Sequence, residues 1–142
     1  MKSDIVFSSQ SDEWETPQGL YDELHAEFGF GLDPCATKET AKCEAWYSKE
    51  QDGLKQEWGG VLFVNPPYSQ IKHWVAKAAN STKAIIVMLI PARTDTRWFH
   101  EFIYHNNKAE IRFIKGRLKF SNSKNSAPFP SMIIIFRNTR KG

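Results

Sequence analysis

Cysteine is scarce in this sequence, and no long apolar run occurs. Cys35 and Cys43 are the only cysteines, too few for a disulfide framework or a four-ligand zinc site. The longest apolar run, residues 84–90, has the length of a strand, whereas a membrane helix needs about 18 apolar residues. These shortages argue against disulfide-stapled and membrane-spanning proteins, and they favour a reduced, cytoplasmic compartment.

A targeting signal and a dominant charge are also missing. The polar start, residues 1–4, has no apolar segment, so we expect no secretory signal. The 19 Lys and Arg against 16 Asp and Glu give a net charge of +3, which permits a polyanionic partner without requiring one. The four histidines lack metal-ligand spacing, so we assign no metal. The length suits a single domain over residues 1–142, with residues 1–12 expected to be flexible.

Apolar periodicity predicts alternating strands and helices. Residues 17–28 read as an amphipathic helix, with Thr16 as its cap and Pro17 in its first position. Strands are expected at 30–32, 46–47, 61–64, 84–90, 110–114 and 132–136. Two further helices are expected: one capped by Ser69, and one that follows Pro91 and ends at about His105. The strand at 84–90 is apolar throughout, which is typical of a central parallel strand. The pattern predicts an α/β fold with a mainly parallel sheet and a C-terminal antiparallel strand pair.

The tetrapeptide Asn65-Pro66-Pro67-Tyr68 directly follows a strand that we expect to be buried. In open α/β sheets, ligands bind beyond the carboxyl ends of the strands. Because neither proline nitrogen carries a hydrogen, the Asn65 amide oxygen and the Pro66 carbonyl can accept hydrogen bonds from a planar amino group. Tyr68 adds a face on which a flat heterocycle can stack. A helix-capping loop with a packed tyrosine is the alternative interpretation.

Four further segments stand in a fixed order around this tetrapeptide. They are Glu15-Thr16-Pro17, Leu32-Asp33-Pro34-Cys35-Ala36, Ile90-Pro91-Ala92-Arg93-Thr94-Asp95 with Trp98-Phe99, and Gly116-Arg117-Leu118-Lys119-Phe120 with Ala127-Pro128-Phe129-Pro130-Ser131. Together the five segments resemble the S-adenosylmethionine-dependent DNA adenine-N6 methyltransferases, in particular the small phage-encoded Dam-like group. The resemblance covers most of the chain.

This resemblance implies a minimal Rossmann-like methyltransferase fold, S-adenosylmethionine as cofactor and double-stranded DNA as partner. A phage-encoded enzyme would work in the cytoplasm of its bacterial host. The resemblance implies that Asn65, Pro66, Pro67 and Tyr68 form the catalytic motif. The target adenine is then flipped out of the duplex and stacks on Tyr68, while Asn65 and the Pro66 carbonyl accept hydrogen bonds from its N6. Methyl transfer is direct, without a covalent enzyme intermediate.

The resemblance also implies cofactor contacts. Thr16 and Pro17 help to hold the methionine end, and Asp33, followed by Pro34, lies near its ammonium group; Asn65 is also assigned to the cofactor site. A turn or cap aspartate is the alternative for Asp33. Pro34-Cys35 is also similar to the Pro-Cys of cytosine-C5 methyltransferases, but it follows the first strand, so we interpret Cys35 as a small buried residue.

Two features depart from the family pattern. Residues 37–39 stand where a glycine-rich turn is usual, and only 32 positions separate Asp33 from Asn65. The sequence therefore does not assign the carboxylates that contact the cofactor's ribose. Asp52 is our candidate for the cofactor's adenine amino group, and a turn residue is an equal alternative.

The long segment over residues 115–131 mixes basic and aromatic residues. Arg117 and Lys119 could contact phosphates while Phe120 or Phe129 stacks on the flipped base. Phe120 is the preferred residue for the second wall of the base pocket, on the face of the base opposite Tyr68. Simple solvated charge is the alternative for this segment. Arg93 and Arg97 are further candidates for phosphate contacts.

The sequence therefore predicts an adenine-N6 DNA methyltransferase. Rival interpretations are transfer to another planar amino group (cytosine N4, RNA adenine or a protein glutamine) and a catalytically idle nucleic-acid-binding module. The target sequence, the oligomeric state and the biological role stay open.

Overall fold

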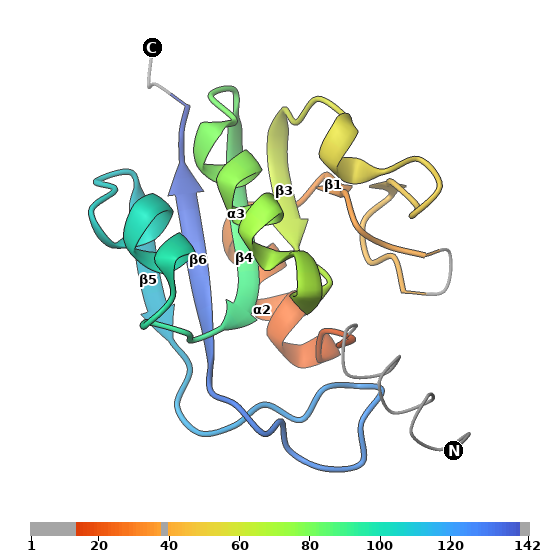
Figure 1. Ribbon diagram of the computed structural model, residues 1–142. Helices are drawn as coiled ribbons and strands as arrows, with labels where there is room; N and C mark the ends of the chain where they lie inside the picture. The colour runs from red at the N-terminus through yellow and green to blue at the C-terminus, as the bar shows by residue number, and fades with distance from the viewer. Residues whose placement is uncertain (1–13, 38–39, 140–142) are drawn as a thin grey trace.

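A single mixed sheet forms the centre of the computed structural model, which describes residues 14–37 and 40–139 (Figure 1). Its strands are β1 (Leu32–Asp33), β2 (Ala45–Trp46), β3 (Gly60–Val64), β4 (Ala84–Pro91), β5 (Ala109–Phe113) and β6 (Ser131–Arg137). The strand order is β2-β1-β3-β4-β6-β5, with parallel pairing from β2 to β4 and antiparallel pairing of β6 with both of its neighbours. The predicted fold class is confirmed. The expected flexibility of residues 1–12 lies outside the described residues.

β4 is the central strand, but only one of its two neighbours is parallel. It pairs in parallel with β3, where Val64 lies opposite Met88, and antiparallel with β6, where Met88 lies opposite Ile134. Both faces are covered, because almost every residue of β4 is buried. The apolar run thus correctly predicted burial but not the direction of β6, since an apolar strand is equally satisfied by a parallel or an antiparallel neighbour.

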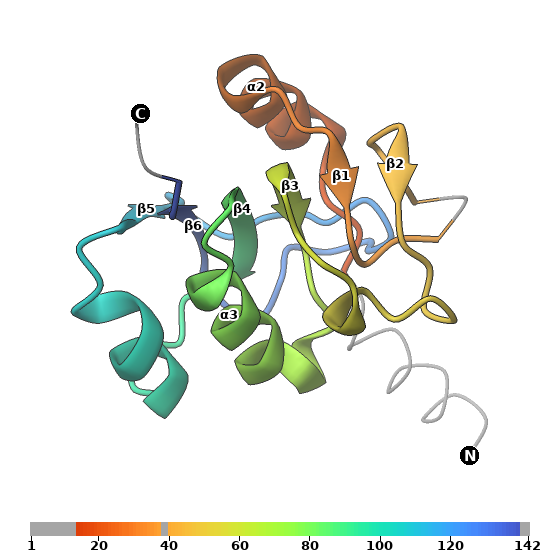
Figure 2. The same cartoon turned by 90° about the horizontal axis from the view of Figure 1, so that it is seen from above.

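Helices cover both faces of the sheet (Figure 2). The helical segments are α2 (Gln18–Phe28), the 3-10 helices η1 (Gly53–Lys55) and η2 (Tyr68–Gln70), α3 (Ile71–Asn80) and the π-helical η3 (Phe99–Tyr104). α2 packs on one face, whereas α3 and η3 pack on the other. No helix in the described part of the chain is long and apolar enough to cross a membrane.

The predicted helix starts need correction. α2 begins at Gln18, Pro17 occupies the N-cap position, and no side chain caps the helix. Ser69 lies within η2, and Gln70 occupies the N-cap position of α3. Thr16 fails as a cap because its hydroxyl is engaged elsewhere, as described below.

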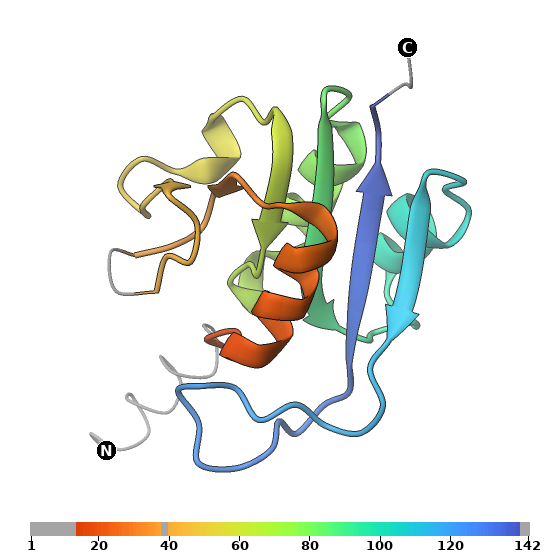
Figure 3. The same ribbon diagram turned by 180° about the vertical axis from the view of Figure 1, so that it is seen from behind.

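Each face of the sheet has its own apolar core. On the α3 face, side chains of β3, β4 and β6 pack against Trp74, Val75 and Phe99. On the α2 face, the opposite side chains of the same strands pack against Tyr21 and Leu24, together with Phe120 from the segment between β5 and β6. Helix α2 alone does not cover this face of the sheet, and the segment between β5 and β6 covers the rest (Figure 3).

The outer edge of the sheet carries a network of ion pairs. Arg112 on β5 bonds to Glu27 of α2 at 2.6 Å and to Glu110 at 2.5 Å, and Glu110 also bonds to Arg137 at 2.6 Å. Both guanidinium groups lie over the ring of Phe28. The network ties α2 to the last two strands of the sheet.

The strand order creates a crevice at the carboxyl ends of β1 and β3. From β1, the chain continues to β2 on one side, and β3 then lies on the other side of β1. The connections therefore diverge between β1 and β3, and such a divergence is where ligands bind in open α/β sheets. β1 ends at Asp33 and β3 is followed directly by Asn65.

Candidate functional site

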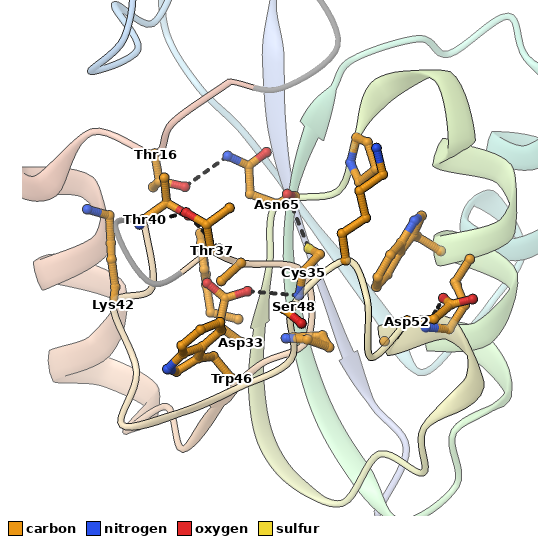
Figure 4. Close-up of a pocket in the computed structure, with 18 of the residues that line it drawn as sticks. Thr16, Asp33, Cys35, Thr37, Thr40, Lys42, Trp46, Ser48, Asp52 and Asn65 are labelled. Atoms are coloured by element: carbon orange, nitrogen blue, oxygen red, sulfur yellow. Dashed lines mark hydrogen bonds between the residues drawn. The ribbon is translucent and has the colours of Figure 1, made fainter.

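A cavity of about 720 Å³ opens at this edge of the sheet (Figure 4). Its volume falls within the range of about 300–1,000 Å³ that is typical of small-molecule sites. The predicted site residues that line it are Thr16, Asp33, Pro34, Asp52, Asn65 and Pro67. Residues far apart in the sequence, from the start of α2, from β1 and from the end of β3, thus converge on one cavity. Pro17, Pro66 and Tyr68 are not part of its lining.

The Asn65 amide has a fixed orientation. Its nitrogen donates hydrogen bonds to the main-chain carbonyl of Trp14 and, at 2.9 Å, to Thr16 Oγ1. A carbonyl oxygen can only accept, so the amide nitrogen must face Trp14 and the amide oxygen must face the other way. Asn65 Oδ1 is buried and has no hydrogen-bond partner among the described residues. A buried acceptor without a hydrogen bond raises the free energy of the folded state, and this oxygen is placed to accept a hydrogen bond from a ligand.

Tyr68 lies beside this amide within a group of aromatic rings. Its ring is 6.3 Å from Trp14, with 25° between the planes, and 5.4 Å from Phe129 in an edge-on contact. Its hydroxyl is buried without a partner among the described residues, and burial raises the pKa of this phenol well above its usual value. Tyr68 is therefore neutral at physiological pH.

Asp33 is a buried carboxyl at the tip of β1. Burial raises its pKa from the usual 3.8 to about 7, against the opposing effects of the Cys35 backbone N–H at 3.2 Å and the charge of Lys42. The side chain is 7% exposed, and it lines the cavity. A carboxyl of this kind gains most from a cationic ligand, because a nearby positive charge favours the ionised form.

Cys35 is not the buried residue that we expected. It is half-buried, lines the cavity, and its thiol donates to the main-chain carbonyl of Asn65 at 3.3 Å. Because the chain leaves β1 at its carboxyl end, Cys35 lies at the border between the cavity and the α3-face core. The contact links the two strand ends that form the cavity.

Asp52 is both a turn residue and a cavity-lining residue. Its backbone has a φ of 53°, and its side chain caps η1 by accepting from Leu54 N at 3.2 Å. The adjacent Gly53 packs so closely on Pro34 that a Cβ would lie 1.9 Å from the Pro34 carbonyl oxygen. The glycine of this turn is required by close packing on the cavity wall.

The loop that lacks the usual glycines is closed by threonines. Thr37 N donates to Thr40 Oγ1 at 2.9 Å, and Thr40 N donates to Thr37 Oγ1 at 3.1 Å. Both residues line the cavity, so this reciprocal pair takes the place of a glycine-rich turn on its wall.

The predicted DNA-contact residues divide into exposed and buried groups. Arg93, Arg97, Arg117 and Lys119 are all exposed, as a phosphate contact requires. Phe120 is only 1% exposed and belongs to the α2-face core, so its expected position on an accessible loop is wrong. The mixture of basic and aromatic residues predicted a base-stacking role for Phe120, whereas its side chain packs in the core on the α2 face of the sheet.

A smaller hollow of about 170 Å³ lies beside Tyr68. Lys72 and Arg93 line it together with Ser69. Two cations next to Tyr68 suit a phosphate group.

Several cavity residues were not predicted from the sequence. They are Trp14, Lys42, Trp46 and Trp74. The position of Trp14, immediately before the Glu-Thr-Pro segment, was the signal that could have identified it. Trp74 also belongs to the α3-face core, and its indole nitrogen is buried with no partner among the described residues.

Comparison with known proteins identifies similar chains. The family model described as DNA N-6-adenine-methyltransferase (Dam) matches residues 3–142. A curated protein of Escherichia phage T1, named DNA N-6-adenine-methyltransferase, is 38% identical over 112 residues, which cover 75% of this chain and 46% of that protein. A protein of the same name from Haemophilus phage HP1 is 28% identical over 139 residues, which cover 90% of this chain and 80% of that protein. The chain thus spans less than half the length of the phage T1 relative.

Proposed function

The chain belongs to the DNA N-6-adenine-methyltransferase (Dam) family, and from this premise we propose that it transfers a methyl group from S-adenosylmethionine to the N6 amino group of adenine in double-stranded DNA. The observation that carries the proposal is the buried, unpartnered Asn65 Oδ1 at the edge of a ligand-sized cavity. Because its amide nitrogen is held by Trp14 and Thr16, the oxygen is presented as an acceptor in advance of substrate binding.

The cavity suits S-adenosylmethionine in size and charge. Asp33 would hold the ammonium group of the methionine end, since this buried carboxyl faces the cavity. Thr16 borders the same part of the site, and Asp52 stands on the η1 wall, where it would receive the adenine amino group. When bound, the cofactor supplies a sulfonium methyl group that is already activated for transfer.

The catalytic motif acts on the target amino group. The lone pair of adenine N6 is delocalised into the ring, which makes this nitrogen a poor nucleophile. Hydrogen bonds from N6 to Asn65 Oδ1 and to the Pro66 carbonyl localise the lone pair and stabilise the positive charge that develops on N6. Fixed placement of both reacting groups supplies much of the remaining acceleration.

The DNA duplex would lie against the carboxyl edge of the sheet. Arg93 follows β4, and Arg117 and Lys119 follow β5, which runs parallel to β4 because both pair antiparallel with β6. These exposed cations therefore flank the strand ends where Asn65 and Tyr68 stand. N6 lies within the base stack, so the adenine must be extruded to reach Asn65. We place the reaction in the cytoplasm of a bacterial host.

The direct test is methyl transfer to defined nucleic acids. The chain is incubated with tritiated S-adenosylmethionine and duplex DNA, the same single strand, or RNA of matching sequence, and the products are digested and identified by mass spectrometry. We expect N6-methyladenine in the duplex. Methylated cytosine, or label confined to RNA or to protein, would contradict the proposed substrate. Cofactor binding by calorimetry without any transfer would indicate an idle binding module.

A further inference from the structure

Trp14 is connected to the catalytic motif through both its main chain and its ring. Its carbonyl accepts a hydrogen bond from the Asn65 amide, and its indole faces the Tyr68 ring. It also lines the large cavity and is half-buried, so part of its surface is open. One residue thus orients the acceptor amide and stands opposite the tyrosine that would stack on the base.

The two rings are nearly parallel, and their spacing is close to what a base between them requires. The Trp14 and Tyr68 centroids are 6.3 Å apart with 25° between the planes. Stacked bases in DNA are about 3.4 Å apart, so a base between two rings needs about 7 Å. The observed separation is within about 1 Å of this value, and a small outward movement of the indole would admit a purine.

Two phenylalanines pack against the indole. Phe120 lies 5.3 Å and Phe129 lies 5.2 Å from the Trp14 ring, and Phe129 also meets the Tyr68 ring edge-on at 5.4 Å. Phe120 is buried in the core. A ring supported in this way has a defined plane without being fully buried.

The same segment also holds the backbone beside Trp14. Ser121 N donates to the Glu15 carbonyl at 3.0 Å, and Ser121 Oγ donates to the Thr16 carbonyl at 3.2 Å. In return, Glu15 N donates to Asn122 Oδ1 at 3.0 Å. The segment between β5 and β6 therefore places residues 14–16 instead of offering Phe120 to the DNA.

We infer that Trp14 is the second wall of the pocket for the extruded adenine, with Tyr68 as the first. The base stacks between the two rings, and its amino group then meets Asn65 Oδ1, whose amide the Trp14 carbonyl holds in place. Phe120 and Phe129 act as supports that fix the indole. The inference rests on the proposed function, and it replaces Phe120 as the residue that stacks on the base.

The test uses three variants of one residue. Trp14→Phe keeps a ring, Trp14→Leu keeps apolar bulk against Phe120 and Phe129 without a ring, and Trp14→Ala removes both. Each is examined with duplex DNA that carries 2-aminopurine at the target position, once a methylated sequence has been found. Phe113→Ala, an aromatic side chain that is 65% exposed on β5, is the matched control.

We expect Trp14→Leu and Trp14→Ala to weaken capture of the extruded base by about 5- to 100-fold, the scale of one base–aromatic stack. Trp14→Phe should stay within a few-fold of wild type, and Phe113→Ala should not differ from it. A mismatched target base should raise capture in wild type and in every variant, because less energy is then needed to extrude it. A purely structural role predicts instead that Trp14→Leu, which keeps the packing against Phe120 and Phe129, behaves like wild type.

Three outcomes would overturn the inference. Unchanged capture in Trp14→Leu means that the ring is not a wall. Tighter capture means that the indole blocks the base position and must leave. A loss in Trp14→Phe as large as that in Trp14→Leu means that the aromatic ring is not what this position contributes. In each case methylation by the wild-type chain is measured in parallel, so the proposed function fails only if no N6-methyladenine forms.

Discussion

Two polar clusters in this protein are built in opposite ways. At the carboxyl edge of the sheet, Asn65 Oδ1 and the Tyr68 hydroxyl are buried and lack partners among the described residues, and Asp33 is buried with a raised pKa. At the outer edge, Arg112 and Glu110 are more than a third exposed, and each bonds to two oppositely charged groups. The first cluster holds buried groups that a ligand can pair with, whereas the groups of the second are already paired with one another. Charge alone therefore does not distinguish the candidate site, because the larger number of ion pairs lies at the other edge.

Removal of the unpartnered acceptor should have the largest effect. Asn65→Ala eliminates the hydrogen bond to the target amino group in the transition state, and we expect methyl transfer to fall by about 10²-fold or more. Cofactor affinity, measured by calorimetry, should change little. Turnover near that of wild type would show that another group accepts from N6.

Loss of the buried carboxylate should weaken cofactor binding. Asp33→Ala should reduce S-adenosylmethionine affinity by about 1.5–3 kcal/mol, the scale of a hydrogen bond with a charged partner. Asp22→Ala, an exposed acid on α2, is the matched control and should bind normally. Equal affinities for the two variants in titration calorimetry would place the cofactor's ammonium group elsewhere.

The raised pKa of Asp33 predicts how stability depends on pH. Between about pH 4 and pH 7 the folded state holds a proton that the unfolded chain has released, because the Asp33 pKa is 3.8 in the unfolded chain and about 7 when folded. The free energy of unfolding should therefore fall as pH rises through this window, by at most about 1.4 kcal/mol per pH unit from this group.

Urea unfolding at a series of pH values checks this prediction. Asp33→Asn keeps an oxygen for the Cys35 N–H but cannot ionise, so it should remove this contribution and be more stable than wild type at pH 8. Saturating S-adenosylmethionine should flatten the wild-type profile as well. Parallel profiles for the two proteins would mean that Asp33 does not titrate in this range.

A substitution in the ion-pair network at the outer edge of the sheet should have the smallest effect. Arg112→Met removes the ion pairs with Glu27 and Glu110 but keeps apolar cover over Phe28, so we expect stability to fall by about 1 kcal/mol or less. The loss should shrink further in high salt, and methyl transfer should not change. A large loss of activity would show that the two edges are coupled.

The sequence could predict the positions of those cavity residues that come directly at the end of a strand. Asn65 and Asp33 each come at the end of an apolar strand, and parallel strand ends meet at one edge, so their convergence could be expected. Trp14 and Phe120 could not be placed in the same way. Trp14 is 51 positions from Asn65, and the burial of Phe120 depends on how much of the α2 face one helix leaves open. Contacts of this kind arise from packing across the whole chain, which local patterns do not encode.

The position of β6 has a consequence for how the protein is made. β4 and β5 are synthesised first, yet they do not pair with each other, because β6 later inserts between them. Until residues 131–137 leave the ribosome, both strands present an unpaired edge, and that of β4 is strongly apolar. Such edges promote association between chains. A ribosome that stalls just before this segment would therefore leave a nascent chain that depends on chaperones, although every residue of the candidate site has already been synthesised.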